Sequence, residues 1–333
     1  MERRKFIKSS AGSLLLVSLP TVNFNIFKIM NKRETKKTEV VIVGAGPAGL
    51  SAALFLARAN RQVIIFDWGK KRMPEKAQIH EYLGFDGMKP REYFAKMRKE
   101  VEKYGALFVE EKVETIRKKE DCTFSIFSDS LELNSKALVL ATGAADVLPE
   151  IPGLMEGWGT DIHVCPCFTG YELSGKKLAL FGIQPRLAHL GTFLTSWSDD
   201  VTVIAEQQFS EEEMDILNKA NVKVHVDKIK ELVRSSGELS YISTNSGEKI
   251  ETDGVFIATP IKANSDLTNN LCEVDENGFA VTDEFCQSST KGLWVIGNAQ
   301  DPKGHMSHAS TDGTQVGPFV ANYLVHLNLE ENE

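Results

Sequence analysis

A glycine-rich segment close to the start of the chain has the spacing of a loop that binds a dinucleotide. Its residues are Gly44, Ala45, Gly46, Pro47, Ala48 and Gly49. In such a loop the first glycine makes a tight turn, the second lets the backbone approach a pyrophosphate, and the third lets the following helix pack closely on the strand. Free N–H groups at the start of that helix would bind the phosphate. The segment therefore predicts a phosphate-binding turn.

The residues on either side of this loop complete a strand–helix–strand unit. Val40–Val43 is a short apolar run that predicts a buried strand, and Ser51–Arg58 predicts the helix that follows the loop. A second strand, Gln62–Phe66, runs into Asp67, whose carboxylate is placed to accept a hydrogen bond from a ribose hydroxyl. Together these features indicate a dinucleotide site, but they do not say which dinucleotide binds there.

The rest of the chain alternates predicted strands and helices, which is typical of an α/β protein with doubly wound sheets. A second unit of the nucleotide-binding type begins with the strand Leu178–Phe181, turns at Gly182-Ile183-Gln184 and continues in the strand Val201–Glu206. The other predicted elements are a helix at Arg91–Tyr104, strands at Lys136–Ala141, Val255–Thr259 and Leu293–Ile296, and a C-terminal helix through Phe319 and Leu324. We therefore predict an α/β fold with two Rossmann-like domains.

The composition limits the classes of protein to which the chain can belong. Its 333 residues are 42% hydrophobic and 25% charged, which fits about two soluble domains with ample cores. The net charge of −8 argues against nucleic acid as a partner. There is no apolar run of about 20 residues, so no membrane span is predicted, and no group of His, Cys and Asp has the spacing of metal ligands.

Cys122, Cys272 and Cys286 are expected to be small buried residues, although an exported protein could pair some of them.

Residues 1–36 have the character of a leader rather than of a fold. Arg3 and Arg4 form a twin-arginine pair, and the mildly apolar stretch Ala11–Leu19 follows them. This order is that of a secretory signal, and the arginine pair is typical of the Tat type. No A-x-A cleavage site follows, so the leader could also be retained as an uncleaved anchor. We therefore expect a periplasmic or exported protein; if the segment is only a disordered basic tail, the protein is cytoplasmic.

Several further motifs follow the glycine loop in a fixed order. They are the segment His80–Gly87, the LATG sequence at Leu140–Gly143, Ile151–Leu154, Cys165-Pro166 with Gly170-Tyr171-Glu172, and Gly292–Asn298. In this order, from about Glu39 to Leu324, the chain resembles the low-molecular-weight thioredoxin reductases of the pyridine-nucleotide–disulfide oxidoreductase group. The resemblance implies an FAD-dependent oxidoreductase, in which a nicotinamide-binding domain is inserted into a split FAD domain.

The same resemblance divides the chain and assigns its cofactor contacts. It implies an FAD domain formed by residues 37–152 and 262–333, and an NAD(P)-type domain at 153–261 that carries Cys165 and Cys167. The implied FAD contacts are the six residues of the glycine loop together with Asp67, His80, Val113, Ala141, Thr142, Gly143, Asn298, His305 and Met306. His308 is expected to be a structural hydrogen-bonding residue. The resemblance also implies a homodimer that acts on thiols or disulfides of a small molecule or a protein.

The cysteine motif departs from the family pattern of Cys-x-x-Cys followed by His. The chain reads CPCFTGYE from Cys165 onward, so Phe168 stands where the family has its second cysteine and Thr169 where it has the histidine. In the family that second cysteine faces the flavin. Cys167 lies one residue earlier, and on a helix its side chain would point about 100° away. Two hypotheses remain: a shifted redox pair, whose disulfide would close a small, strained and easily reduced ring, or a decayed motif with a bystander thiol.

The second nucleotide-type loop also departs from the family. Gln184 stands where a glycine would let the backbone touch a pyrophosphate, and its side chain obstructs that approach. No arginine cluster follows Glu206, so a 2′-phosphate lacks a cation and NADPH is disfavoured, whereas Glu206 could still hold the ribose of NAD. Binding of NAD(P)H is therefore uncertain. Asn298 replaces the usual aspartate of the last FAD strand, which is a mild change because asparagine can still bond a ribityl hydroxyl.

These departures and the leader favour one hypothesis. A protein exported to a periplasm meets no pool of NADPH, whereas FAD bound before export would travel inside the folded protein. We hypothesise an exported flavoprotein that takes electrons from a thiol or another small organic substrate and passes them to oxygen or a partner. In the thiol version the substrate attacks Cys165 and Cys167 resolves the mixed disulfide. The alternatives are a conventional NAD(P)H-dependent thioredoxin-disulfide reductase and a catalytically silent flavin-binding or docking protein.

Overall fold

The computed structural model of the protein describes residues 35–121, 123–302 and 304–330. The predicted leader and Cys122 therefore lie outside the described residues, except that Thr35 and Lys36 begin the first strand, β1. Among the described residues, no helix combines the length and the apolar character that a membrane crossing requires.

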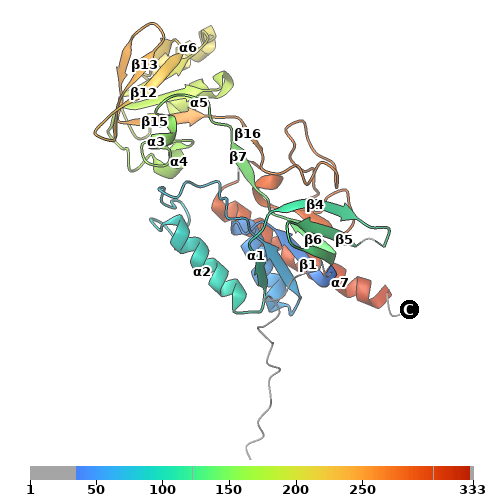
Figure 1. The fold of residues 1–333 in the computed structure, drawn as a ribbon. Coiled ribbons are helices and arrows are strands. Elements are labelled where there is room, and N and C mark those ends of the chain that lie inside the picture. The colour runs from blue at the N-terminus through green and yellow to red at the C-terminus, as the bar shows by residue number, and fades with distance from the viewer. Residues whose placement is uncertain (1–34, 122, 303, 331–333) are drawn as a thin grey trace, which may run out of the picture. The chain divides into compact units, whose positions relative to one another are not determined.

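The first sheet contains seven strands in the order β3-β2-β1-β6-β5-β4, with β17 paired to β6. Figure 1 labels β1, β4, β5 and β6 of this sheet. The strands are β1 (Thr35–Val43), β2 (Val63–Phe66), β3 (Leu107–Val109), β4 (Val113–Lys118), β5 (Phe124–Ser128), β6 (Glu132–Leu140) and β17 (Leu293–Val295). β1, β2, β3, β6 and β17 run parallel, and β4 and β5 form an antiparallel extension. Val43 pairs with Phe66 on one side and Leu140 on the other, so three strands end at the same edge.

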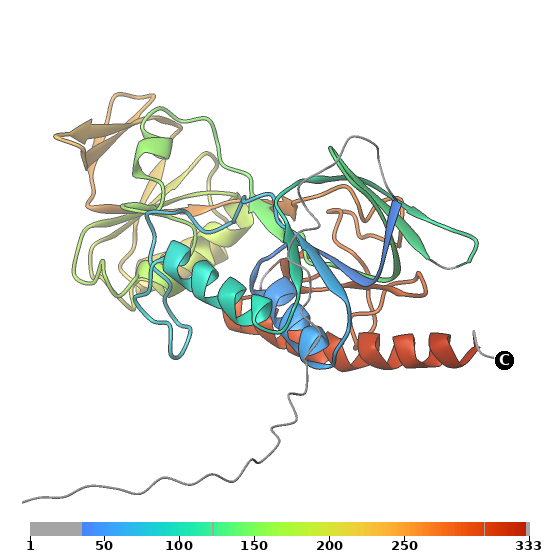
Figure 2. The ribbon, with the colours of Figure 1, turned by 60° about the horizontal axis from the view of Figure 1, so that its bottom comes forward.

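Two helices pack closely on one face of this sheet, α1 (Pro47–Arg58) and α7 (Met306–Glu330). They lie side by side in Figure 2, and α2 (Pro90–Glu102) also packs against α1. A Cβ at Gly313 would lie 2.1 Å from the carbonyl oxygen of Ala48, and one at Gly317 would lie 2.6 Å from the ring of Phe55. Two glycines one helical turn apart therefore allow α7 to approach α1 so closely.

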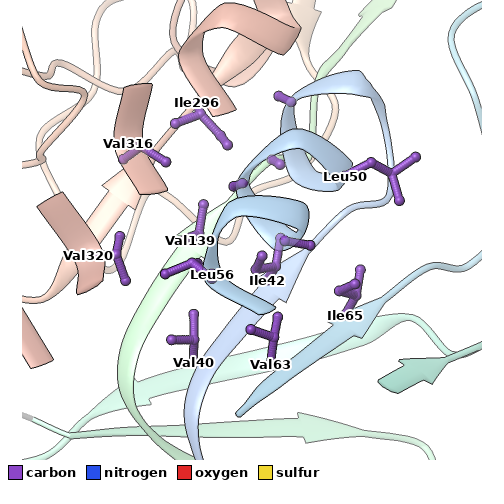
Figure 3. Close-up of a cluster of buried hydrophobic side chains, with 14 of the residues drawn as sticks. Val40, Ile42, Leu50, Leu56, Val63, Ile65, Val139, Ile296, Val316 and Val320 are labelled. Carbon is purple, nitrogen blue, oxygen red and sulfur yellow. The ribbon is translucent and has the colours of Figure 1, made fainter. Parts of the chain in front are cut away.

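An apolar core fills the space between this sheet and its helices (Figure 3). Val40 and Ile42 of β1 point into it, where they meet Leu56 of α1 and Val316 and Val320 of α7. All five side chains are fully buried. Because burying an aliphatic side chain contributes about 1.5–3 kcal/mol, this core holds the glycine loop, which joins β1 to α1, in a fixed position.

The second sheet has the order β11-β10-β9-β15-β8 and its strands run parallel. Its elements are β8 (Ile162–His163), β9 (Leu178–Gly182), β10 (Val201–Ala205), β11 (Lys223–Val226), β15 (Gly254–Ala258), α5 (Gln184–Leu194) and α6 (Glu211–Lys219). An antiparallel sheet of β12 (Ile229–Ser235), β13 (Glu238–Thr244) and β14 (Lys249–Glu251) accompanies it. The short helices α3 (Leu154–Gly157) and α4 (Pro166–Thr169) precede β9.

Two short strands connect the sheets. β7 (Ala144–Asp146) leads out of the first sheet, and β16 (Ile261–Ala263) pairs with it antiparallel on the way back (Figure 1). After β16 the chain adds the strand β17 to the first sheet and the helix α7 to the layer beside it. The first sheet is therefore built from two separate stretches of sequence. The predicted α/β class with two Rossmann-like sheets is confirmed.

Candidate cofactor and redox site

A pocket at the carboxyl end of the first sheet gathers most of the residues that the sequence singles out, and we call it the glycine-loop pocket. Its lining includes Gly44, Ala45, Gly46, Pro47, Ala48, Asp67, His80, Val113, Ala141, Thr142, Gly143, Cys165, Asn298, His305 and Met306. The other two predicted site residues, Gly49 and Cys167, are not part of the lining. The pocket thus joins the N-terminal, central and C-terminal segments of the described chain.

The three glycines of the loop have three different surroundings. A Cβ at Gly44 (φ +111°) would lie 2.2 Å from the carbonyl oxygen of Ala141, and one at Gly49 would lie 1.9 Å from that of Gly44. A Cβ at Gly46 would meet no atom within 4 Å. Gly46 is the N-cap residue of α1, and because glycine has no side chain, no capping side chain covers the first N–H groups of the helix. The loop therefore presents the free N–H groups of α1 to the pocket, as an anion requires.

Basic side chains that the sequence analysis did not identify border the same pocket. Lys70, Lys71 and Arg72 all contribute to its lining. Lys71 Nζ lies 2.7 Å from Asp67 Oδ1, and Arg72 donates to both carboxylate oxygens of Asp146 at 2.9 and 2.7 Å. Since this basic run begins three residues after the predicted ribose-binding acid, its position was a signal for cations beside a phosphate.

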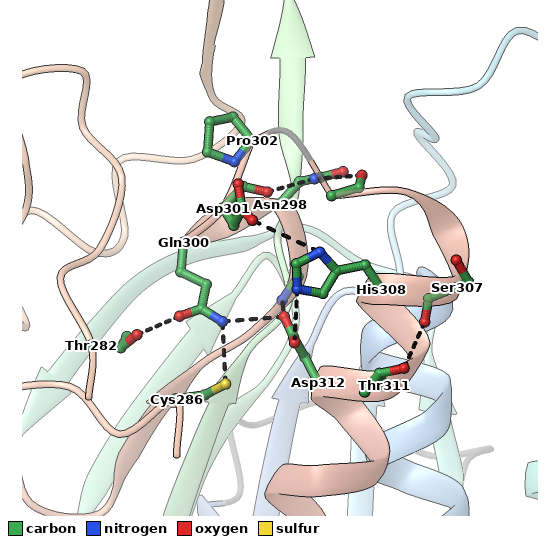
Figure 4. A network of polar contacts seen from close by, with 12 residues as sticks. Thr282, Cys286, Asn298, Gln300, Asp301, Pro302, Ser307, His308, Thr311 and Asp312 are labelled. Carbon is green, nitrogen blue, oxygen red and sulfur yellow. Dashed lines mark hydrogen bonds and ion pairs between the residues drawn. The ribbon is translucent and has the colours of Figure 1, made fainter. Parts of the chain in front are cut away.

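Asn298 lies in a short 3₁₀ turn, η1 (Gly297–Ala299), that follows β17. Its Nδ2 donates to the carbonyl oxygens of Asp301 and Gly304 at 2.7 and 3.0 Å, and Arg72 donates to its Oδ1 at 3.4 Å. Figure 4 shows how this amide ties the turn to the following loop. A carboxylate cannot donate hydrogen bonds, which gives a physical reason for asparagine rather than aspartate at this position.

A buried carboxylate from α7 supports the same turn. Asp312 accepts hydrogen bonds from the backbone N–H of Gly297 at 2.9 Å and from Gln300 Nε2 at 3.1 Å (Figure 4). Gln300 Nε2 also lies 3.2 Å from the Sγ of Cys286, and burial raises the pKa of that thiol to about 11. His308 Nε2 lies 3.7 Å from Asp312 Oδ1, and His308 is not in the pocket lining. This network fixes the backbone at the pocket edge.

Two histidines connect the pocket to the segment that carries the cysteines. His80 Nε2 lies 3.4 Å from Glu172 Oε1, just beyond α4. His305 Nδ1 lies 3.3 Å from Glu81 Oε2, and its ring meets the ring of Phe168 edge-on at a centroid distance of 5.4 Å. These contacts hold the cysteine segment against the glycine-loop pocket.

The two cysteines of this segment are placed differently. Cys165 is the N-cap residue of α4 and lines the pocket together with Phe168 and Thr169, whereas Cys167 does not line it. Both cysteines are free thiols. Burial, together with a hydrogen bond to the Cys167 side chain, raises the pKa of the Cys165 thiol to about 12. The hydroxyl of Thr169 is buried and has no hydrogen-bond partner among the described residues.

His163 is a site residue that the sequence analysis missed. It lines the pocket, is 9% exposed, and its ring lies against Phe256 of the second sheet at 5.7 Å. Burial lowers its pKa to about 4, and its Nε2 lies 3.1 Å from the carbonyl oxygen of Thr160. The histidine is therefore neutral near pH 7. Only its position before Cys165 in the sequence could have drawn attention to it.

The second sheet contains a loop that corresponds to the glycine loop. A Cβ at Gly182 (φ +130°) would lie 2.1 Å from the carbonyl oxygen of Ala258, so this glycine makes the same kind of tight turn as Gly44 does. Gln184 follows at the start of α5, and its Nε2 donates to the carbonyl oxygen of Gln207 at 3.3 Å. Leu187, at the position of the third glycine, is fully buried.

Comparison with known proteins identifies this arrangement. The family model described as pyridine nucleotide-disulphide oxidoreductase matches residues 38–313. The chain belongs to this family. The thioredoxin reductase tcpT of Claviceps purpurea is 30% identical over 302 residues, covering 86% of this oxidoreductase and 94% of that protein. The thioredoxin reductase of Bacillus subtilis is 26% identical over 312 residues, covering 88% and 97%.

Solved structures of the same type superimpose well on the oxidoreductase. The crystal structure of HlmI has a TM-score of 0.86 at 30% sequence identity and covers 90% of this chain and 97% of its own. That of an oxidoreductase from Agrobacterium tumefaciens has a TM-score of 0.81 at 29% identity and covers 87% and 99%. The predicted resemblance to thioredoxin-reductase-like enzymes is therefore confirmed.

The residues of the glycine-loop pocket fit FAD, the flavin cofactor of this family. The space above Gly46 and the open start of α1 suit the pyrophosphate, and Asp67 would bind a ribose hydroxyl. Thr169, whose buried hydroxyl has no partner among the described residues, lines the pocket together with Cys165. When bound, FAD accepts an electron pair from a donor and passes it on. The protein is an FAD-dependent oxidoreductase, as expected from the sequence.

Within the described part of the chain, no cluster of His, Cys, Asp or Glu is suited to a metal ion.

Proposed function

We propose that the protein is an exported FAD-dependent dithiol oxidase whose nicotinamide site has lost its function. A small-molecule or protein dithiol would supply electrons through Cys165 and Cys167, and dioxygen or a partner protein would receive them from the reduced cofactor. We infer this from the contrast between the glycine loop and its counterpart in the second sheet.

The observation that carries this proposal is the hydrogen bond from Gln184 Nε2 to the carbonyl oxygen of Gln207, at 3.3 Å. It spans the gap between the start of α5 and the chain just after β10. A pyrophosphate needs the bare backbone at this position. At the corresponding place in the first sheet, Gly46 leaves the approach open. Binding of a nicotinamide dinucleotide would have to break this bond and move the glutamine side chain aside.

The charged side chains around this second loop have partners of their own. Glu206, which would hold a ribose, has Lys228 Nζ at 3.5 Å from its Oε2. This exposed pair is weak, and Asp67 has a shorter pair of the same kind with Lys71 at 2.7 Å, so the pair does not distinguish the two loops. Arg186 donates to the carbonyl oxygen of Thr259 at 3.2 Å, so this cation is engaged with the backbone. The contrast between the loops therefore lies at Gly46 and Gln184.

The proposed reaction balances without a nicotinamide. A substrate dithiol would reduce the Cys165–Cys167 disulfide by two thiol–disulfide exchanges, which yields a substrate disulfide and two enzyme thiols. Formation of the enzyme disulfide then releases two electrons to FAD and two protons. Dioxygen takes up two electrons and two protons as hydrogen peroxide.

Two other functions have specific observations in their favour. A conventional NAD(P)H-dependent thioredoxin-disulfide reductase is favoured by the names of the relatives from Bacillus subtilis and Listeria monocytogenes, both thioredoxin reductases. A catalytically silent flavin-binding protein is favoured by Phe168, which stands at the place of the family's second cysteine. The nicotinamide and cysteine experiments below separate these candidates from a dithiol oxidase.

Oxygen consumption with dithiothreitol tests the thiol chemistry. We expect the purified holoprotein to consume dioxygen and form peroxide when dithiothreitol is added, and Cys165→Ser and Cys167→Ser each to lower the rate by about 100-fold or more. Cys272→Ser is the matched control, since Cys272 lies outside the pocket lining and should leave the rate unchanged. Turnover that survives both the Cys165 and the Cys167 substitution would exclude the proposed dithiol chemistry.

Export is part of the same proposal and is supported by the twin-arginine pair, Arg3 and Arg4. We expect the full chain in the periplasmic fraction of its cells, and an Arg3→Lys/Arg4→Lys variant in the cytoplasm. A wild-type protein found only in the cytoplasm would contradict this part of the proposal, and a membrane-bound one would indicate an uncleaved leader.

We also propose a homodimer. Phe285 and Phe319 pack ring to ring at 4.6 Å while 39% and 38% of their surfaces stay exposed, which suits an apolar contact between two copies. Light scattering of the holoprotein at micromolar concentration is expected to give twice the mass of one chain. A monomer mass would contradict this assignment.

A further inference from the structure

We propose that Cys165 is the thiol that faces FAD and that Cys167 is the sulfur that the substrate attacks. This inference rests on the proposed dithiol chemistry and specifies how it works. It reverses the order expected from the sequence, in which the substrate attacks Cys165 and Cys167 resolves the mixed disulfide. It also reverses the order along the chain that the family motif implies, where the second cysteine is the one beside the flavin.

The position of the two side chains carries this assignment. Cys165 lines the glycine-loop pocket and Cys167 does not, although both are half-buried. The difference comes from the local backbone. Cys165 is the extended N-cap residue of α4 (φ −144°, ψ 129°), and Pro166 starts the helix directly after it. The extended residue can direct its side chain to the pocket, while Cys167 follows the helical turn.

Phe168 explains why the usual order cannot apply. Its side chain lines the pocket at the place where the family has the flavin-side thiol, and its ring packs edge-on against His305 at 5.4 Å. An aromatic ring can neither transfer electrons as a thiolate nor form a disulfide. Of the thiols in this segment, Cys165 is therefore the one that can pass electrons to FAD directly.

The surroundings of the two thiols are consistent with different roles. Burial and a hydrogen bond to the Cys167 side chain raise the pKa of Cys165 to about 12. A thiolate of high basicity leaves a disulfide more slowly, so the raised pKa by itself does not favour attack on Cys167, although it makes Cys165 the stronger electron donor once it is free. Access favours attack on Cys167, because bound FAD would cover the pocket side of Cys165. The Cys167 side chain contributes to the raised pKa of Cys165, which places the two side chains near each other.

A substrate thiolate attacks Cys167 Sγ of the oxidised enzyme, the Cys165–Cys167 bond breaks, and Cys165 leaves as the thiolate. The second substrate thiol attacks the mixed disulfide, which releases the substrate disulfide and leaves a thiol on Cys167. Cys165 then gives up the electron pair to FAD as the bond to Cys167 re-forms and a proton leaves Cys167. Dioxygen is the final oxidant, as in the proposed function.

Alkylation of the reduced holoprotein tests the assignment without measuring activity. The protein is reduced with dithiothreitol under argon, desalted and treated with iodoacetamide, and the labelled cysteines are counted by peptide mass spectrometry. We expect Cys167 to be labelled at least about tenfold faster than Cys165 while FAD is bound. Equal rates, or faster labelling of Cys165, would overturn the assignment. The wild-type chain is used, so no variant has to fold.

A matched pair of variants supplies a second readout. Cys165→Ser leaves only Cys167 in the motif, and Cys167→Ser leaves only Cys165. After treatment with oxidised glutathione, we expect at least about tenfold more glutathione on Cys167 in the first variant than on Cys165 in the second, at equal FAD content. The reverse ratio, or equal amounts, would overturn the assignment. A different result would overturn the proposed function itself: dithiothreitol would then fail to reduce the flavin of the wild-type protein.

Discussion

The two sheets contain the same loop in two versions, one open and one closed. Gly44 and Gly182 both have a positive φ. A Cβ at Gly44 would lie 2.2 Å from the carbonyl oxygen of Ala141, and a Cβ at Gly182 would lie 2.1 Å from that of Ala258. This first glycine is required by the fold, since without it the strand and the helix could not be joined in this geometry. Both loops have kept it.

The loops differ at the positions that serve a ligand. Gly46 leaves open space at the start of α1, whereas Gln184 extends its side chain to the carbonyl oxygen of Gln207. Leu187, at the third position, adds an apolar side chain to the core of the second sheet. The tight turn therefore belongs to the architecture, and we propose that the second glycine serves the cofactor. Changes at the second position can therefore remove binding without damage to the fold.

The largest expected effect comes from closing the open loop. Gly46→Gln should weaken FAD binding by about 100-fold, close to 3 kcal/mol, because the side chain would occupy the pyrophosphate approach. The backbone at Gly46 is extended (φ −79°, ψ −177°), so glutamine fits its conformation. FAD titration by fluorescence measures the affinity, and circular dichroism checks the fold. An unchanged affinity would show that the comparison between the loops is wrong.

The second sheet contains a histidine that should make the protein less stable in acid, because burial lowers the pKa of His163 to about 4. Between about pH 6.5 and pH 4 the unfolded chain takes up a proton that the folded chain does not, so stability falls as the pH falls, by up to about 3 kcal/mol. Urea denaturation at several pH values measures this. His163→Gln should flatten this part of the profile, and an unchanged slope would contradict it.

The acids that end the second strand of each unit offer a smaller test. Asp67→Asn should weaken FAD binding by about tenfold, or about 1.4 kcal/mol, because a charged acceptor of a ribose hydrogen bond is lost. Glu206→Gln is its counterpart in the second sheet and should leave FAD affinity and flavin reduction unchanged. A loss of activity in the Glu206 variant would instead indicate a working nicotinamide site.

The smallest effect is expected from opening the closed loop. Gln184→Gly removes the hydrogen bond to Gln207, but Leu187 and the Glu206–Lys228 pair remain. We expect unchanged FAD content, unchanged dithiol oxidation and a stability loss of about 1 kcal/mol. Stopped-flow mixing with NADH measures whether the change restores any reduction. Rapid reduction in this single variant would mean that the glutamine alone closes the site.

The sequence predicted the α/β fold and the FAD loop because both depend on local patterns. The apolar run Val40–Val43, the glycine spacing and the terminal Asp67 are readable in one short stretch. Short-range errors were small: the second strand of the second unit ends at Ala205 rather than at Glu206. Most predicted cofactor contacts line one pocket, although their binding to FAD stays a prediction.

The remaining features depend on contacts between distant segments. The pair of Arg72 with Asp146 joins residues 74 positions apart, and no sequence period indicates it. Which cysteine lines the pocket follows from the extended backbone at Cys165 and the docking of α4, rather than from helical spacing alone. The burial of His163 against Phe256 could not be read from its neighbours in the chain.

Anaerobic reduction of the purified holoprotein with NADH, NADPH and dithiothreitol, side by side, tests the central claim most directly. The visible absorbance of oxidised flavin is followed after rapid mixing with each donor. We predict that dithiothreitol bleaches the flavin within seconds to minutes, while both nicotinamides leave it oxidised over the same time. Rapid bleaching by NADH or NADPH would contradict the account, because it would show that the loop at Gln184 admits a nicotinamide after all.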